Sequence, residues 1–126
     1  MKPKVLVVDS ERVVADTLAW IFEKRGFECK VAYTGNQAED TVGEYCPHLL
    51  LCDVTIAGTE DLELVSRLTA RCPESRVLLL LGHYNHLEIA AQWAERHPVP
   101  SRIVTKPILP DHLLREAQAL LEIPHA

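Results

Sequence analysis

The sequence of 126 residues lacks any long apolar run. No hydrophobic stretch approaches the ~20 residues of a membrane-spanning helix, and the N-terminus leads directly into a short apolar segment rather than into the core of a signal peptide. The sequence also contains no internal repeat and no low-complexity segment. These absences favour a cytoplasmic protein that has no membrane partner.

Positive charge is also scarce. Lys and Arg number 13 against 18 Asp and Glu, which gives a formal net charge of -5 at pH 7. Binding of nucleic acid by this chain alone would need a basic surface, so no direct nucleic-acid contact is expected. The length suits one domain over residues 1–126, enough to bury roughly two thirds of the unfolded surface in a single core.

The cysteines show no C-x-x-C spacing. They are Cys29, Cys46, Cys52 and Cys72. Cys52 falls inside a predicted central strand, where a small apolar side chain is expected. The favoured interpretation is therefore reduced thiols that pack in the interior, with disulfides as the alternative.

Short apolar segments alternate with longer stretches of helical periodicity along the whole chain, which is typical of an α/β fold with a parallel sheet. The predicted strands are residues 4–8, 28–32, 48–52, 76–81 and 101–105. Four of them are apolar without alternation, as expected for strands that helices cover on both faces. The mixed composition of residues 28–32 suits an edge strand.

Five helices are predicted around these strands. The first covers about residues 11–25 and ends at Gly26, which suits the left-handed position beyond a helix. Thr34 and Gln37 have the spacing of a capping box for the second helix, and the third covers about residues 60–71.

The fourth helix has Asn85 and Glu88 at capping spacing, and the last begins near Pro110. The predicted inward face of the fourth helix consists of Leu87, Ala90, Ala91 and Ala94. Trp93 lies beside that face, where it is either an interface anchor or a cover for the rim of the core.

Polar residues end three of the apolar segments: Asp9, Asp53 and Lys106. The carboxyl ends of parallel strands line the ligand crevice of an open α/β sheet, so the two carboxylates and the ammonium group are expected to share one pocket. The alternative is a structural ion cluster, because partly buried charges need partners in any protein.

The segments Val-Val-Asp-Ser-Glu (7–11), Leu-Leu-Leu-Cys-Asp-Val (49–54) and Thr-Lys-Pro (105–107) occur in this order at domain-wide spacing. In this combination the chain resembles the receiver domain of two-component response regulators over essentially its whole length. The resemblance implies a doubly wound, flavodoxin-like sheet of five parallel strands in the order 2-1-3-4-5. It also implies a cis peptide bond before Pro107.

The resemblance also implies roles for individual residues. Asp53 looks like the phosphoacceptor, and Lys106 would contact the phosphoryl group. Asp9, Asp53 and the backbone carbonyl of Thr55 would hold Mg²⁺ together with waters. Thr55 and His83 occupy positions that flank the attacking water during self-dephosphorylation, so they are candidates for tuning the lifetime of the phosphate.

Several positions depart from the family pattern. Ser10 replaces the second consecutive acid after the first strand, which predicts weak Mg²⁺ binding, and Glu11 is interpreted as an acid of the first helical turn rather than as a replacement ligand. Leu81 stands where the family has a Ser or Thr, and Ile103 stands where it has an aromatic residue. The usual switch is therefore expected to be impaired, whereas Gly82 keeps access to the acceptor open.

The leading hypothesis is a divergent receiver that accepts a phosphoryl group from a histidine kinase or phosphotransfer protein and signals by protein contact, with at most weak self-dephosphorylation as enzymatic activity. A downstream partner is expected on the fourth helix, the strand at 101–105 and the last helix. That face would carry Tyr84, Trp93, His97 and Ile103. A homodimer is also compatible with the sequence.

One alternative remains open at this stage, and two others are disfavoured. A pseudo-receiver would keep the fold and act as a docking or dimerisation module without phosphorylation. A flavin-binding electron carrier would need a hydroxyl- and glycine-rich phosphate loop after the first strand, which Asp9-Ser10-Glu11 does not provide, so no organic cofactor is expected. A metal pair of His83 and His86 lacks a third ligand nearby.

Overall fold

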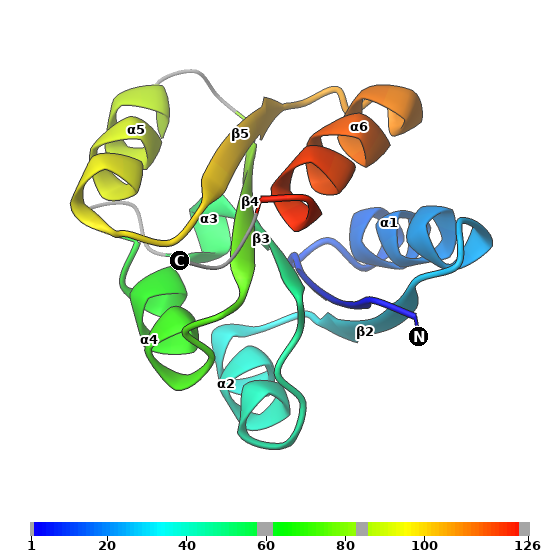
Figure 1. Ribbon diagram of the computed structural model, residues 1–126, viewed down its shortest axis with the longest axis horizontal. Coiled ribbons are helices and arrows are strands. Elements are labelled where there is room, and N and C mark those ends of the chain that lie inside the picture. The colour runs from blue at the N-terminus through cyan, green and yellow to red at the C-terminus, as the bar shows by residue number, and fades with distance from the viewer. Residues whose placement is uncertain (1, 58–61, 83–85, 124–126) are drawn as a thin grey trace.

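The centre of the molecule is a parallel sheet of five strands in the order β2-β1-β3-β4-β5 (Figure 1). The computed structural model describes residues 2–57, 62–82 and 86–123. The strands are β1 (Lys4–Val8), β2 (Glu28–Ala32), β3 (Leu49–Asp53), β4 (Arg76–Leu81) and β5 (Ser101–Thr105). The predicted α/β fold and strand order are confirmed. Four strands have the predicted limits, and β3 begins and ends one residue later.

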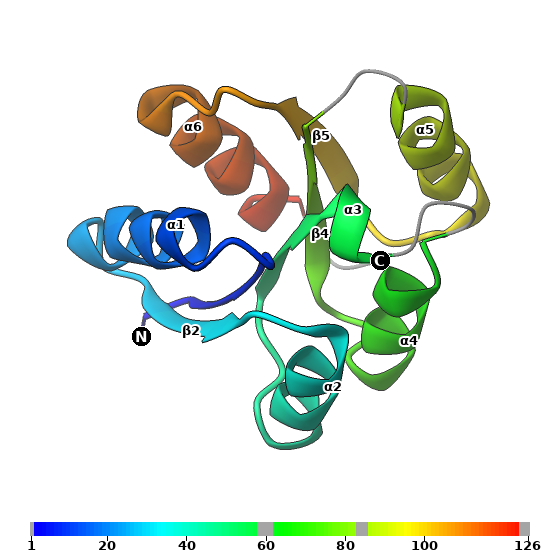
Figure 2. The ribbon, with the colours of Figure 1, turned by 180° about the vertical axis from the view of Figure 1, so that it is seen from behind.

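Helices cover both faces of the sheet. On one face lie α1 (Arg12–Lys24) and α6 (Pro110–Leu121), and on the other lie α2 (Gly35–Glu44), α4 (Glu63–Arg71) and α5 (Leu87–Arg96), as Figures 1 and 2 show from opposite sides. A short additional helix, α3 (Val54–Ala57), follows β3 directly. The sheet is therefore enclosed between two helical layers.

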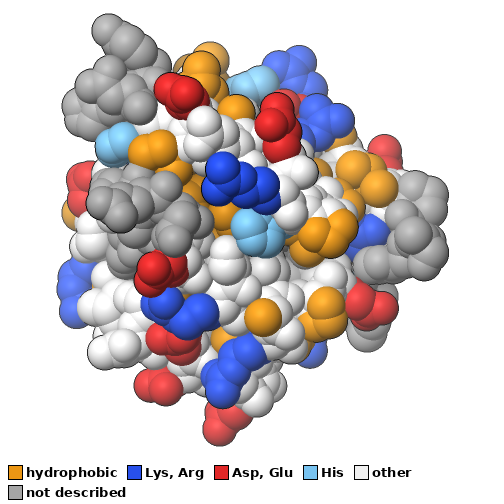
Figure 3. Space-filling view, turned by 90° about the vertical axis from the view of Figure 1, so that its left-hand side faces the viewer, with side chains coloured by type: hydrophobic (Ala, Val, Ile, Leu, Met, Phe, Trp, Pro, Cys, Tyr) orange, Lys and Arg blue, Asp and Glu red, His pale blue; other side chains and the backbone are white. Residues whose placement is uncertain are grey.

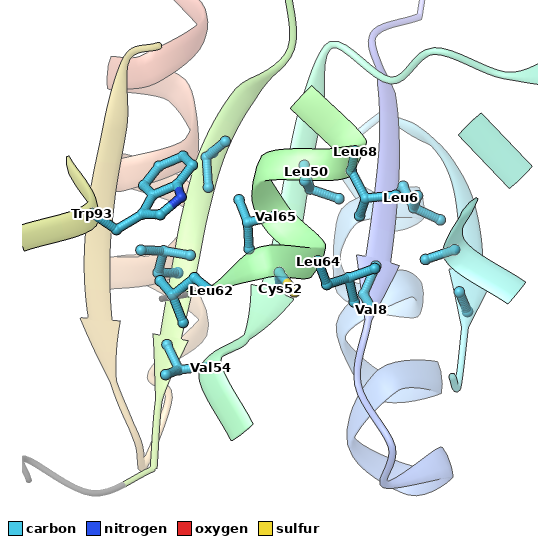
Figure 4. Close-up of a cluster of buried hydrophobic side chains, with 14 of the residues drawn as sticks. Leu6, Val8, Leu50, Cys52, Val54, Leu62, Leu64, Val65, Leu68 and Trp93 are labelled. Carbon is cyan, nitrogen blue, oxygen red and sulfur yellow. The ribbon is translucent and has the colours of Figure 1, made fainter. Parts of the chain in front are cut away.

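Each central strand sends alternate side chains into two separate cores. Leu6 and Val8 of β1 belong to the cluster beneath α2, α4 and α5, which Figure 4 shows. Val5 and Val7 of the same strand pack instead under α1 and α6. Both faces of the strand are apolar for this reason, which explains why the sequence shows a continuous hydrophobic run rather than alternation.

Local signals at two helix ends act as predicted. The Thr34 hydroxyl accepts a hydrogen bond from the backbone N–H of Gln37 at 3.1 Å, and the Gln37 side chain accepts one from the backbone N–H of Tyr33 at 2.8 Å. Beyond α1, Gly26 has a φ of 90°, in the left-handed region that a residue with a side chain rarely adopts. The Gly26 backbone conformation thus marks the end of α1, and the two hydrogen bonds mark the start of α2.

The prediction for residues 60–71 was wrong at its start. Leu62 is fully buried and has a left-handed backbone with φ of 53°, so α4 begins only at Glu63. An α-helix cannot continue through a residue with this left-handed backbone. Residues 58–61 lie outside the described residues.

The predicted inward face of the fourth helix was also partly wrong. In α5, Ala90 and Trp93 are buried, whereas Leu87 is 46% exposed and Ala91 is exposed. A stripe composed mainly of alanines offers little apolar area, so the much larger Trp93 side chain decides which face turns inward. Asn85, the predicted cap, lies outside the described residues.

A disulfide joins Cys46, which follows α2, to Cys72 at the C-terminal end of α4. The favoured interpretation of reduced thiols was therefore wrong for these two residues and holds for the free cysteines Cys29 and Cys52. The pairing depends on the packing of α2 beside α4, which the spacing of cysteines along the chain does not reveal.

Within the described ranges, no helix combines the length and the apolar character needed to cross a membrane. The longest, α1, has 13 residues.

Candidate functional site

The three polar strand-end residues meet at the carboxyl edge of the sheet. Asp9 follows β1, Asp53 ends β3 and Lys106 follows β5. The Lys106 Nζ lies 3.5 Å from Asp9 Oδ2 and 3.7 Å from Asp53 Oδ1. Lys106 reaches the carboxylates across β4, where its backbone N–H donates to the carbonyl of Leu81 at 2.8 Å. The convergence predicted from the strand ends is what the structure shows.

Asp9 is fully buried, and a backbone group two residues along the chain fixes its side chain. Its Oδ1 accepts a hydrogen bond from the backbone N–H of Glu11 at 2.9 Å, while its Oδ2 faces Lys106. Burial raises the pKa of this carboxyl, and the Glu11 hydrogen bond and the Lys106 charge oppose that rise without cancelling it. Glu11 itself is an exposed N-cap residue of α1, so its backbone, rather than its carboxylate, takes part in the site.

The two carboxylate oxygens of Asp53 have different surroundings. Oδ2 accepts a hydrogen bond from the Thr55 hydroxyl, which comes from the first turn of α3. Oδ1 is buried with no hydrogen-bond partner and faces the Lys106 ammonium group. The sequence suggested a role for the Thr55 backbone but did not reveal this hydroxyl contact, for which the only signal is a hydroxyl residue two positions after an aspartate.

A family model described as the response regulator receiver domain matches residues 5–118. The chain belongs to this family. The cis peptide bond that the resemblance implied is present between Lys106 and Pro107.

Solved structures give the same fold. A CheY-like receiver domain protein from Methanospirillum hungatei has 21% identity and a TM-score of 0.85, with 97% of this chain and 95% of that chain covered. A response regulator from Thermotoga maritima has 23% identity and a TM-score of 0.84, with coverage of 98% and 100%. NtrX from Brucella abortus has 28% identity and a TM-score of 0.85, and its match covers 97% of this chain but only 27% of NtrX.

The polar edge of this receiver fits a divalent cation held by few protein ligands. Asp9 and Asp53 supply two carboxylates, and the single Lys106 ammonium group beside them leaves part of their negative charge for a cation to neutralise. Mg²⁺ is often held by one or two carboxylates together with waters and phosphate oxygens. Among the described residues, no group of three or more His, Cys, Asp or Glu side chains is arranged to hold a metal.

The divergent positions surround this cluster without adding a polar group to it. Leu81 ends β4 and is 1% exposed, and Ile103 is half-buried against the core beneath α5. Ser10 is exposed. A Cβ placed on Gly82 would meet only the Lys106 side chain, at 3.9 Å, so there is space beside the cluster. His83, the candidate for tuning phosphate lifetime, lies outside the described residues.

On the predicted partner face of α5, β5 and α6, Trp93 takes the second of its two expected roles, as a cover for the core. Trp93 is 2% exposed, and its indole N–H donates to the Ser66 hydroxyl of α4 at 3.0 Å, so it is not an exposed anchor. The His97 ring stacks on Trp93 at 4.3 Å and lies at a groove of about 420 Å³ between α4 and α5. Figure 3 shows this side of the molecule, with Lys, Arg and His side chains near its middle. Tyr84 lies outside the described residues.

Proposed function

We propose that this receiver accepts a phosphoryl group on Asp53 from the phosphohistidine of a histidine kinase or phosphotransfer protein. The observation that carries the proposal is the buried Asp53 Oδ1, which lacks a hydrogen-bond donor and faces the ammonium group of Lys106 at 3.7 Å. A purely structural ion pair would be expected to satisfy both carboxylate oxygens. An oxygen left without a donor is instead available as a nucleophile.

In this reaction Asp53 Oδ1 attacks phosphorus, the P–O bond forms as the P–N bond of phosphohistidine breaks, and the departing imidazole nitrogen takes up a proton. The Thr55 hydroxyl holds Oδ2, so the carboxylate presents one particular oxygen. Lys106 stabilises the charge on the phosphoryl oxygens, since phosphoryl transfer depends mainly on positioning and electrostatics. Bound Mg²⁺, held by Asp9, Asp53 and the Thr55 backbone carbonyl, would supply further neutralisation of that charge.

The proposal has consequences for partners and location. The receiver acts in the cytoplasm, and it catalyses at most weak self-dephosphorylation, with Thr55 and His83 as the residues that tune phosphate lifetime. The output is contact with a downstream protein on the face formed by α5, β5 and α6. The exposed Leu87 at the start of α5 supplies apolar area for that contact in place of the buried Trp93.

Leu81 and Ile103 favour a signalling mechanism that differs from the family's switch, which uses a Ser or Thr and an aromatic residue at these positions. Leu81 has no hydroxyl to bind the phosphoryl group, and Ile103 has no aromatic ring to change rotamer. Phosphorylation would then act mainly by adding charge to the carboxyl edge, where Lys106 is drawn from the carboxylates toward the phosphoryl oxygens.

The second candidate function is a docking module that needs no phosphate. The observation in its favour is that Lys106 already lies between Asp9 and Asp53, so the cluster is partly neutralised without any added group. Ser10, which removes one acid from the site, favours the same alternative.

Intact-mass measurement after incubation with Mg²⁺ and a small phosphodonor separates the two functions. We expect one phosphate adduct on the native chain and complete loss of that adduct in Asp53→Asn, because the amide oxygen is a much weaker nucleophile than a carboxylate. A receiver known to accept the donor is treated in parallel. No adduct on the native chain, while the parallel receiver is labelled, would overturn the proposed phosphate uptake and favour the docking module.

A further inference from the structure

The disulfide between Cys46 and Cys72 lies at the opposite end of α4 from the phosphoacceptor. α4 begins at Glu63, shortly after the segment that leads from Asp53, and its C-terminal end carries Cys72. Cys46 follows α2, so the bond ties the ends of two neighbouring helices. Disulfides in a reducing compartment are generally transient and take part in redox chemistry, which makes the accessibility of this one informative.

The two sulfur-bearing residues differ in exposure. Cys46 is exposed, whereas Cys72 is 3% exposed and belongs to the core cluster beneath α2 and α4. An attacking thiolate must approach one sulfur in line with the S–S bond, and access decides which sulfur it reaches. Only the Cys46 side offers an approach from solvent.

The site also accommodates the reduced pair. Cys72 Sγ lies 3.7 Å from the carbonyl oxygen of Val42, and Cys46 Sγ lies 3.8 Å from that of Arg71. After reduction, each carbonyl oxygen can accept a hydrogen bond from the neighbouring thiol. Other contacts between α2 and α4 do not depend on the disulfide, since the Arg67 guanidinium donates to the Glu39 carboxylate at 2.8 Å. The two helices therefore keep at least one contact that does not require the bond.

The remaining cysteines do not compete for this chemistry. Burial, with the nearby carboxylates of Glu23 and Glu28, raises the pKa of the Cys29 thiol to about 12. Cys52 is fully buried within β3, and burial raises the pKa of its thiol as well. Neither thiol provides a thiolate near neutral pH, and the thiolate is the reactive form.

We propose that Cys46–Cys72 is a reversible thiol–disulfide exchange site at which a protein dithiol attacks Cys46. The partner is a reductant with two neighbouring thiols of the C-x-x-C type. A groove of about 350 Å³ runs along the disulfide and is lined by Pro47, His48, Pro73 and Glu74 beside the two cysteines. Such a groove gives a protein reductant more surface to contact than a small thiol needs.

The exchange proceeds in two steps that move two electrons. A thiolate of the reductant bonds to Cys46 Sγ, the Cys46–Cys72 bond breaks, and Cys72 leaves as a thiolate that takes up a proton. The second thiol of the reductant then attacks the mixed disulfide, which releases Cys46 as a thiol and leaves the reductant oxidised. A disulfide oxidant such as oxidised glutathione reverses the sequence and closes the bond again.

Trapping of the mixed disulfide tests the proposal on the native chain. The probe is reduced thioredoxin whose second active-site cysteine is replaced by serine, so that the first step cannot be resolved. After equilibration of the receiver with oxidised glutathione, we expect a one-to-one adduct that peptide mapping places on Cys46. An adduct on Cys72, or none, would overturn the proposal.

Variants and a small thiol complete the test. Cys29→Ser is the matched control and should form the adduct as the native chain does, whereas Cys46→Ser, which has neither the disulfide nor the attacked sulfur, should lose it completely. Loss of the adduct in Cys29→Ser would contradict the assignment. We also expect thioredoxin with both active-site cysteines to reduce the bond faster than the same concentration of glutathione. The rate is measured by alkylation of the two released thiols. Equal rates would overturn the choice of a protein dithiol as partner.

Discussion

The carboxyl edge of the sheet carries Asp9, Asp53 and Lys106, whereas the amino edge carries a disulfide and buried hydrogen bonds between loops. At the amino edge the buried Ser75 hydroxyl donates to the carbonyl of Pro47 at 2.6 Å. At the carboxyl edge the equally buried Asp53 Oδ1 has no hydrogen-bond donor. The buried Ser75 hydroxyl thus joins two segments at the amino edge, whereas one buried oxygen at the carboxyl edge is left available for chemistry.

This difference follows from how parallel strands are connected. The loops after the strands diverge toward helices on opposite faces and leave a crevice between them. The segments before β3 and β4 are instead held against each other, since Cys46 and Cys72 lie just ahead of those strands. Stability and reactivity are thus concentrated at opposite ends of the same strands.

Reduction of the disulfide should give the largest effect on stability. The bond closes a loop with a sequence separation of 26, for which the chain-entropy relation gives about 3.5 kcal/mol of stabilisation. We expect the free energy of unfolding, measured with urea at pH 7, to fall by about that amount when dithiothreitol is added. Cys72→Ser should show no difference between the two conditions. An unchanged midpoint for the native chain would contradict the role assigned to the amino edge.

Removal of one buried hydroxyl at the same edge should have a smaller effect. In Ser75→Ala the Pro47 carbonyl loses its donor while staying buried, so the free energy of unfolding should drop by roughly 1–2 kcal/mol. Ser10→Ala, at an exposed residue of the opposite edge, should change it by less than about 0.5 kcal/mol. Equal effects of the two substitutions would remove the contrast between the edges.

The strands and the meeting of the charged residues could be predicted because they depend on local patterns. Continuous apolar runs bounded by turn residues mark strands buried on both faces, and a polar residue at the end of each run must lie at the shared edge. The Thr34–Gln37 capping pair is equally local. Sequence position alone thus located Asp9, Asp53 and Lys106, although their chemical roles remain proposals.

The features that were missed depend on packing between elements. The choice of Trp93 over Leu87 for the inward face of α5 is decided by the space beneath α4, where the indole N–H finds the Ser66 hydroxyl. The Cys46–Cys72 bond needs α2 and α4 side by side, and cysteine spacing does not reveal connectivity. The left-handed backbone of Leu62, directly before α4, was also missed, because leucine rarely adopts this conformation and its identity gives no signal for it.

Substitution of Asp9 should show that the buried carboxylate lowers the free energy of unfolding at neutral pH. Because burial raises the pKa of this carboxyl in the folded state, the folded chain holds a proton that the unfolded chain has lost, and stability falls as the pH rises from the ordinary value of 3.8 through the folded pKa. Asp9→Asn keeps an acceptor for the Glu11 N–H and avoids this loss. We expect it to be more stable than the native chain at pH 7.

The pH dependence of that difference is the decisive measurement for Asp9. The gain should shrink as the pH falls and vanish below the ordinary carboxyl pKa, where both chains hold the residue uncharged. Asp40→Asn, at an exposed residue of α2, provides the matched substitution and should give no such gain. A gain for Asp9→Asn that is the same at pH 3 and pH 7 would show that charge is not its cause.

The smallest effect is expected at Gly82, the residue thought to keep the acceptor accessible. Its backbone is not in the left-handed region, and an added Cβ would meet Lys106 Cδ at an ordinary contact distance of 3.9 Å. Gly82→Ala should therefore raise the free energy of unfolding by about 0.4–1 kcal/mol through the unfolded chain and leave phosphate uptake on Asp53 unchanged by intact mass. Loss of phosphate uptake in a stably folded variant would mean that the phosphodonor reaches Asp53 past residue 82 and that the added methyl group blocks it. The carboxyl edge would then be a confined site rather than an open one.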